Sequence, residues 1–254
     1  MGLDAFVLLA VVGVLAGVIN SVVGSGSLVT FPTLIALGVP PVVASITNTI
    51  GVLPANIAGA WSYRQTFRDE WRFLGLIAGC SAIGGLTGAL LLTQLPADAF
   101  RAVVPVLIAA ALVLVIFGPA IKAWALARST RSAGDRSERS PGLLVAVAVT
   151  GVYGGYFGAA QGVILLSLFS LTLRGGLQRA NAYKNAVTAA GNIVAAVVFL
   201  SIGDVEWGAA AVLAVSSFAG GLVGGKVGQR LPDTVYRVLI VGVGIAALAY
   251  FLLT

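Results

Sequence analysis

Long apolar runs follow one another along most of the chain, and short polar turns separate them. A helix that crosses the hydrocarbon core of a bilayer needs about 20 mostly apolar residues. The runs of roughly that length or more cover residues 5–37, 41–63, 73–94, 99–121, 142–173, 180–202, 207–229 and 234–254. The pattern predicts an all-α, polytopic integral membrane protein embedded in a lipid bilayer.

Two of these runs, 5–37 and 142–173, are too long for one ordinary span, and small and polar residues interrupt each near its middle. The first interruption covers residues 20–27 and the second covers residues 154–162. Non-helical backbone is tolerated at membrane depth only where it is buried in protein or lines a cavity. The two interruptions are therefore the leading candidates for a binding site.

The chain consists of two similar halves, as matching pairs of short motifs show. These pairs are Glu70-Trp71 with Glu206-Trp207, Gly84-Gly85-Leu86 with Gly220-Gly221-Leu222, and Leu95-Pro96 with Leu231-Pro232. A repeat of this length indicates the two-half architecture of a transporter. We predict a first membrane repeat over residues 1–127, a flexible cytoplasmic linker over 128–141 and a second membrane repeat over 142–254, which together form one transport domain.

Basic residues predict the topology, because short cytoplasmic loops carry an excess of Lys and Arg. The basic residues form four clusters: Arg64, Arg68 and Arg72; Lys122, Arg128, Arg131, Arg136 and Arg139; Arg174, Arg179 and Lys184; and Lys226, Arg230 and Arg237. If all four clusters are cytoplasmic, every basic residue except Arg101 lies inside. The run 142–173 then begins and ends inside the cell, and the run 5–37 begins and ends outside.

Each half is then a re-entrant pair of short helices followed by three full spans. Because three is odd, the two halves have opposite orientations, which predicts inverted repeats with both chain termini outside. The alternative treats each interrupted run as one long tilted span and gives eight spans with parallel repeats. That alternative would put the cluster from Arg174 to Lys184 outside, so we favour the inverted arrangement.

Composition agrees with a membrane protein and excludes several classes. Apolar residues make up 59% of the chain and charged residues 9%, whereas a soluble domain has about 25% charged residues. The chain has no His and one Cys, Cys80, so we expect no metal, no cofactor and no disulfide framework. The net charge of +6 reflects the cytoplasmic loops, so a nucleic-acid partner is not needed to explain it.

Acidic residues all fall in loops or at the ends of the predicted spans. An acidic proton relay through the membrane is therefore not visible. If transport is coupled to protons, they travel on the substrate or involve Lys184. The same pattern argues against an intramembrane aspartyl protease or metalloenzyme, which need carboxylate or His groups, so we do not expect an enzyme.

The helices that follow the two interruptions would start near the middle of the membrane. Their free backbone N–H groups and positive dipole ends make a ready anion site, and Ser25 or Ser27 can cap the first of them. The alternative is that the Gly-rich turns only let helices pack closely. The candidate substrate ligands are Asn20, Gly24, Ser25, Gly26 and Ser27 at the first interruption, and Tyr156, Gln161 and Gly162 at the second.

Three further polar residues on the following spans complete the predicted site. Asn48 and Asn185 would bridge its two sides, or alternatively form interhelical hydrogen bonds. Lys184 is the basic residue that we expect to contact an anion; the alternative is that it snorkels to the cytoplasmic interface. Tyr156 is either a site hydroxyl or only a helix contact.

The residues around the first interruption resemble the start of the TauE/SafE sulfite-exporter family. The resemblance is carried by the stretch from Gly17 to Pro32, by Leu37-Gly38-Val39-Pro40-Pro41, by Thr47-Asn48 and by Gly59-Ala60-Trp61-Ser62-Tyr63-Arg64. Through the internal repeat it extends over essentially the whole chain. In one respect the chain differs, because many members have Lys directly after this Asn, where the chain has Thr49.

The resemblance implies a multi-pass carrier in the plasma (cell) membrane for small sulfur-containing anions, either sulfite or organosulfonates such as sulfoacetate. Such a carrier would work by alternating access around an anion site at the membrane midplane. A passive anion channel, or a carrier of another small organic anion, is the alternative. In the second half Lys184 precedes Asn185, so the resemblance leaves open which half supplies the positive charge.

Overall fold

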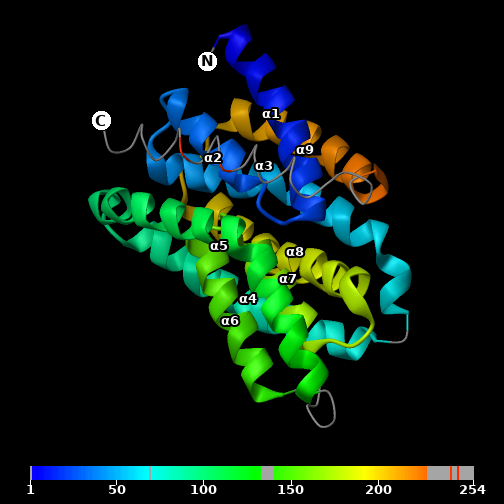
Figure 1. The fold of residues 1–254 in the computed structure, drawn as a ribbon. Helices are drawn as coiled ribbons and strands as arrows, with labels where there is room; N and C mark the ends of the chain where they lie inside the picture. The colour runs from blue at the N-terminus through cyan, green and yellow to red at the C-terminus, as the bar shows by residue number, and fades with distance from the viewer. Residues whose placement is uncertain (1, 69, 133–139, 228–240, 242–244, 246–254) are drawn as a thin grey trace.

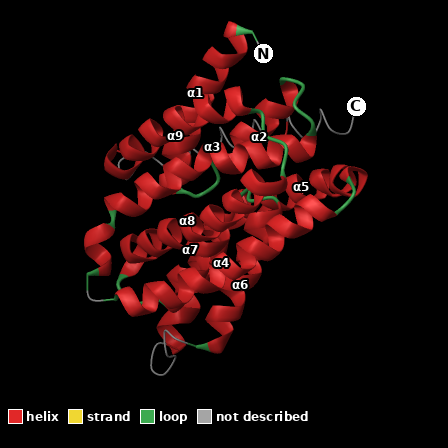
Figure 2. Cartoon of the chain, turned by 180° about the vertical axis from the view of Figure 1, so that it is seen from behind, coloured by secondary structure: helices red, strands yellow, loops and turns green. Residues whose placement is uncertain are grey.

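A computed structural model describes residues 2–68, 70–132, 140–227, 241 and 245 of the protein (Figure 1). Nearly all of this part of the chain is helical, and it contains no β-strand (Figure 2). The elements in chain order are α1 (Leu3–Val22), α2 (Ser27–Ala36), α3 (Pro41–Ser62), the 3-10 helix η1 (Arg64–Phe67), α4 (Trp71–Gln94), α5 (Ala97–Ser132), α6 (Pro141–Tyr156), α7 (Gln161–Thr172), α8 (Gly176–Ile202) and α9 (Trp207–Val227). The predicted all-α class is confirmed.

Both long apolar runs are broken where the sequence predicts. The first run is divided into the helices α1 and α2, and the second run is divided into α6 and α7. Gly24 at the first break has φ +86° and Ala160 at the second has φ +60°. Gly24 follows the end of α1, and Ala160 is the residue directly before α7. A left-handed residue cannot continue a regular α-helix, so the backbone itself fixes both interruptions.

Five helices in the described part of the chain are long and apolar enough to cross a membrane. They are α1, α3, α4, α8 from Gln178 and α9 as far as Gly225. The helices α2, α6 and α7 are shorter. Since α1 alone has the length of a span, the re-entrant path through α1 and α2 stays a prediction. The last predicted run, 234–254, lies mostly outside the described residues.

The helices form two groups that mix the two halves of the sequence. In Figures 1 and 2, α1, α2, α3 and α9 lie in the upper group, whereas α4, α6, α7 and α8 lie in the lower group. Helix α1 packs along α9, and α6 packs along α4; likewise α3 packs against α9, and α8 against α4. Helix α4 of the first half thus packs with helices of the second half, and α9 of the second half packs with helices of the first half. The two halves of the sequence are therefore not separate bodies in space.

Glycines allow these exchanged helices to pack closely. A Cβ atom on Gly84 or Gly88 would collide with the backbone of α6, and one on Gly220 or Gly224 would collide with the backbone of α1. Small residues of this kind let membrane helices approach each other. The repeated glycines at these positions therefore allow close helix packing in both halves.

Large apolar side chains cover much of the outer surface, as expected for a protein in lipid. Examples are Val11 on α1, Ile83 on α4 and Val215 on α9, all more than half exposed. Trp71 and Trp207 are the first residues of α4 and α9 and are 58% and 63% exposed. Their position at helix ends is that of interface anchors.

Helix α5 is longer than the sequence predicts. It continues through Ser132, so the first five residues of the predicted flexible linker, 128–132, are helical. At the other end of the linker, the backbone N–H of Leu143 donates to the Ser140 hydroxyl at 3.4 Å, and Pro141 opens α6. The rest of the linker, 133–139, lies outside the described residues.

Candidate substrate site

The two breaks touch each other inside the molecule. The backbone N–H of Gly162, at the start of α7, donates to the carbonyl oxygen of Gly24 at 3.1 Å. A Cβ on Gly24 would lie 2.5 Å from the Cα of Gly162, and one on Gly162 would lie 2.7 Å from the Gly24 oxygen. Neither position therefore has room for a side chain, and the two predicted sides of the site are in direct contact.

Helix α8 binds the end of α1 just before the crossing of the two breaks, which is the contact of Gly24 with Gly162. The Lys184 ammonium donates to the backbone oxygens of Asn20 at 2.9 Å and Ser21 at 3.2 Å. The side-chain amides of Asn181 and Asn185 donate to the same Ser21 oxygen at 3.2 and 3.3 Å. These side chains satisfy carbonyls that a helix C-terminus leaves without partners, at the negative end of its dipole.

Lys184 is buried in the centre of the molecule. Its side chain is 1% exposed, and its Cδ would lie 3.2 Å from a Cβ on Gly24. The alternative that Lys184 snorkels to the interface is therefore wrong. Among the described residues an ion pair joins Arg179 to Glu70, and no carboxylate contacts Lys184. A cation without a counter-ion inside a membrane is costly and indicates a functional site.

Buried donors without partners lie at both breaks. The Ser25 hydroxyl and the Gln161 side-chain amide are each 1% exposed and make no hydrogen bond to the described residues. The Asn56 amide nitrogen is also buried and unpartnered, while its oxygen accepts a hydrogen bond from Asn20. Since buried polar groups in proteins nearly always have partners, these donors are suited to a ligand rich in oxygen.

The two helix N-termini differ in what their backbone offers. At the start of α7, the N–H groups of Gln161, Gly162 and Val163 donate to backbone oxygens at 3.0 to 3.3 Å. At the start of α2, the N–H groups of Ser25, Gly26 and Ser27 have no partner within the described part of the chain. The first break is thus the one with backbone donors available for an anion.

The prediction that Ser25 or Ser27 caps α2 is wrong. The N-cap residue of α2 is Gly26, and no side chain caps the helix. Ser27 is the first residue of α2 and is half-buried. The reason is the turn at Gly24, because it places Ser25 before the cap position and leaves its hydroxyl unpartnered.

The two Asn residues expected to bridge the site have different surroundings. Asn185 lies beside the crossing, with its amide nitrogen on Ser21 and its amide oxygen buried without a partner. Asn48, on α3, instead accepts a hydrogen bond from the Thr30 hydroxyl of α2. For Asn48 the structure therefore shows the interhelical hydrogen bond that the sequence left as the alternative.

Tyr156 makes a helix contact. Its ring packs edge-to-face on Phe100 of α5, with 5.5 Å between ring centroids. Tyr153, one turn earlier on α6, is the tyrosine that reaches the second break, where its hydroxyl donates to the Ala159 oxygen at 2.5 Å. Sequence reasoning missed Tyr153, because two tyrosines three positions apart are equally good candidates until the helix ends are known.

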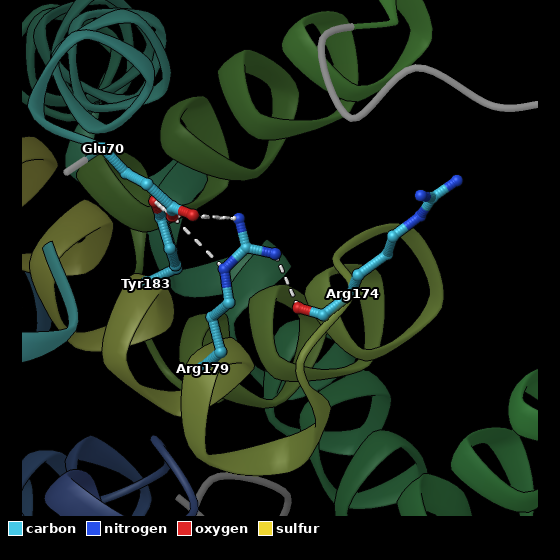
Figure 3. Close-up of polar contacts among 4 residues, drawn as sticks. All are labelled: Glu70, Arg174, Arg179 and Tyr183. Atoms are coloured by element: carbon cyan, nitrogen blue, oxygen red, sulfur yellow. Dashed lines mark hydrogen bonds and ion pairs between the residues drawn. The ribbon is translucent and has the colours of Figure 1, made fainter.

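A second polar cluster joins the start of α4 to the start of α8 (Figure 3). The Arg179 guanidinium donates to both Glu70 oxygens at 2.8 and 2.9 Å and to the Arg174 backbone oxygen at 2.6 Å. The Tyr183 hydroxyl also donates to Glu70. Sequence reasoning missed this cluster too, although an acid next to a basic loop was a signal for it.

The arrangement defines a class of protein. Its features are apolar helices of spanning length, two broken helices that meet at their breaks, and a buried cation beside unpartnered donors. This is the architecture of a helical membrane transporter, in which discontinuous helices form the binding site.

The family model described as "Sulfite exporter TauE/SafE" matches residues 9–251, and the chain belongs to this family. The resemblance found in the sequence is thereby confirmed. The chain is a membrane transporter, not an enzyme.

Curated relatives have the same general description. A probable membrane transporter protein of Haemophilus influenzae is 28% identical over 249 residues, which is 95% of this chain and 92% of the relative. The probable membrane transporter protein YfcA of Escherichia coli K12 is 29% identical over 87% of this chain and 81% of its own length. The probable membrane transporter protein ORF9 of Sinorhizobium sp is 30% identical over 95% of this chain and 91% of its own length. No solved structure matches the chain.

Proposed function

We propose that this protein carries sulfite, or an organosulfonate such as sulfoacetate, across the cell membrane by alternating access, with the anion bound where the two breaks cross. One observation carries the proposal: the Lys184 ammonium is fully buried beside the crossing and contacts no carboxylate among the described residues. A small anion is the counter-ion that this position lacks.

The free donors suit the oxygens of such an anion. An ammonium has three N–H groups, and Lys184 uses two of them on the end of α1. The Ser25 hydroxyl, the Gln161 amide and the backbone N–H groups of residues 25–27 are the other donors. Sulfite and sulfonates each present three oxygens, and charge-assisted hydrogen bonds to them are strong.

The Glu70–Arg179 ion pair supports the inverted arrangement of the repeats. It joins the loop before α4 to the start of α8, so two of the four basic clusters lie at one end of the molecule. The inverted model puts both clusters on one side of the membrane, the cytoplasm, and this agrees with the contact. The eight-span alternative puts them on opposite sides of the membrane, which the contact disfavours.

Binding measurements on purified protein test the proposal. Sulfite, sulfoacetate, thiosulfate and sulfate are titrated side by side into the wild type and into two variants, Lys184→Ala and Thr87→Ala. Thr87 lies on the exposed face of α4 and serves as the control. We expect sulfite or sulfoacetate to bind the wild type and the control equally, and to bind folded Lys184→Ala at least about tenfold more weakly, because a charge-assisted hydrogen bond is lost. If none of the four anions binds the wild type, the substrate assignment is wrong; if Lys184→Ala keeps wild-type affinity, the site is wrong.

A further inference from the structure

The C-terminal end of α1 has the chemistry of a cation site. Its last carbonyl groups have no partner within the helix, and the helix dipole puts partial negative charge there. Around this end lie the carbonyl oxygens of Asn20 and Ser21 and the side-chain amides of Asn181 and Asn185. In transporters with broken helices, such a carbonyl end commonly coordinates a coupling Na+.

Two side-chain oxygens beside this end receive no donor from the described residues. Asn181 and Asn185 are both more than nine-tenths buried, and in the described part of the chain the amide oxygen of each has no hydrogen-bond partner. Amide and backbone oxygens are ordinary ligands of hard cations. The group that lies against the backbone oxygens is the Lys184 ammonium, at 2.9 Å from Asn20 and 3.2 Å from Ser21.

We propose that Lys184 fills a monovalent-cation site at the carbonyl end of α1 with its own ammonium, so that transport needs no Na+, and that shortening this side chain opens the site to Na+. The ammonium supplies the same single positive charge as the ion and binds the same carbonyls. Because it is tethered to α8, it cannot be carried across with the substrate. The statement about transport rests on the proposed function, whereas the cation site does not.

Thermal unfolding of purified protein without substrate tests the site. The wild type, Lys184→Ala and the matched variant Lys184→Arg are compared in the chlorides of Na+ and of N-methyl-D-glucamine at one ionic strength. We expect a saturable rise of several degrees in the unfolding midpoint of Lys184→Ala in Na+, because an ion that binds only the folded state stabilises it. The wild type and Lys184→Arg, which keep a cation in the site, should have the same midpoint in both salts.

Two results would contradict the proposed cation site. One is a folded Lys184→Ala protein whose unfolding midpoint does not change with Na+, and the other is a wild type whose midpoint Na+ raises. If Lys184→Ala does not fold, the wild type decides. Its sulfite flux into proteoliposomes should be equal with Na+ or N-methyl-D-glucamine on both sides, and a flux that requires Na+ overturns the inference. If sulfite does not move in either salt, the proposed function fails instead, and the unfolding midpoints still decide the cation site.

Discussion

At the scale of single residues, the contact between Gly24 and Gly162 sets how closely the two halves of the protein approach each other. The two backbones share a hydrogen bond, and no space remains for a Cβ atom on either residue. The side chain of Lys184 passes the same point. The crossing of the two breaks and the buried positive charge are therefore one local structure.

An alanine at position 162 tests this crossing, because Gly162 lies in helix α7 without a positive φ and the nearest atoms that a Cβ would meet belong to Gly24. We expect Gly162→Ala to lower the free energy of unfolding by about 1–3 kcal/mol, the usual cost of overpacking, and to lower transport. Gly75→Ala and Gly79→Ala on α4 are matched controls, since a Cβ there meets no atom within 4 Å. Equal unfolding midpoints for Gly162→Ala and the controls would contradict the tight crossing.

Ser25 offers a test of opposite sign. Its buried hydroxyl has no partner among the residues that the structure describes, so Ser25→Ala should leave the unfolding midpoint unchanged or raise it slightly. If the hydroxyl binds the substrate anion, the same variant should lose roughly 1.5–3 kcal/mol of binding free energy, the range for hydrogen bonds to charged groups. Titration calorimetry and thermal unfolding on the same sample separate the two effects. Unchanged affinity would remove Ser25 from the site.

At the scale of helices, the sequence predicts where the two long runs break, but it does not predict which groups bind the helix ends at these breaks. Gly24 and Gly158 identify both turns, because each has a left-handed backbone conformation that glycine adopts readily. The sequence does not predict that Lys184 binds the end of α1, since its partners are backbone oxygens, which leave no mark in the side-chain pattern. For the same reason, the cap of α2 could not be assigned before the turn geometry was known.

Helix α8 carries two polar connections, and the one at its start is testable. Arg179 binds Glu70 through two nitrogens, with the side chains 16% and 35% exposed. We expect Arg179→Lys to lower the free energy of unfolding by roughly 1 kcal/mol, because an ammonium cannot make the bidentate contact that a guanidinium makes with a carboxylate. A double-mutant cycle with Glu70→Gln measures the coupling in thermal unfolding. A coupling energy near zero would show that solvent screening cancels the contact.

At the scale of the whole molecule, α4 of the first half packs against α6 and α8 of the second half. The directions of these helices can therefore be compared with the predicted topology. Because α4 and α8 both begin beside the Glu70–Arg179 pair, both run away from the same end of the molecule. Asp98, in the first turn of α5, and Asp204, in the loop after α8, therefore lie at the other end. The sequence predicts the repeat and the side of each loop, but it does not predict which helices pair, because glycine stripes on four helices fit one another in several ways.

Cysteine labelling on intact cells checks this topology. In a chain whose Cys80 is replaced by Ala, single cysteines are placed at the exposed positions Thr66, Arg174, Asp98 and Asp204. We expect an impermeant maleimide to label Asp98→Cys and Asp204→Cys from outside, and to label Thr66→Cys and Arg174→Cys only in inverted vesicles. Labelling of Arg174→Cys on intact cells would support eight spans with parallel repeats instead.

Counterflow in proteoliposomes tests most directly the central claim, that the crossing of the two breaks is the site of an anion carrier. Vesicles that contain the purified protein are loaded with unlabelled sulfite or sulfoacetate, and the entry of the same anion in radiolabelled form is followed. We predict that entry saturates with concentration, is accelerated by the internal anion and is lost in Lys184→Ala. Entry that rises without saturation and carries current, with no acceleration from the internal anion, would contradict the account and indicate a channel.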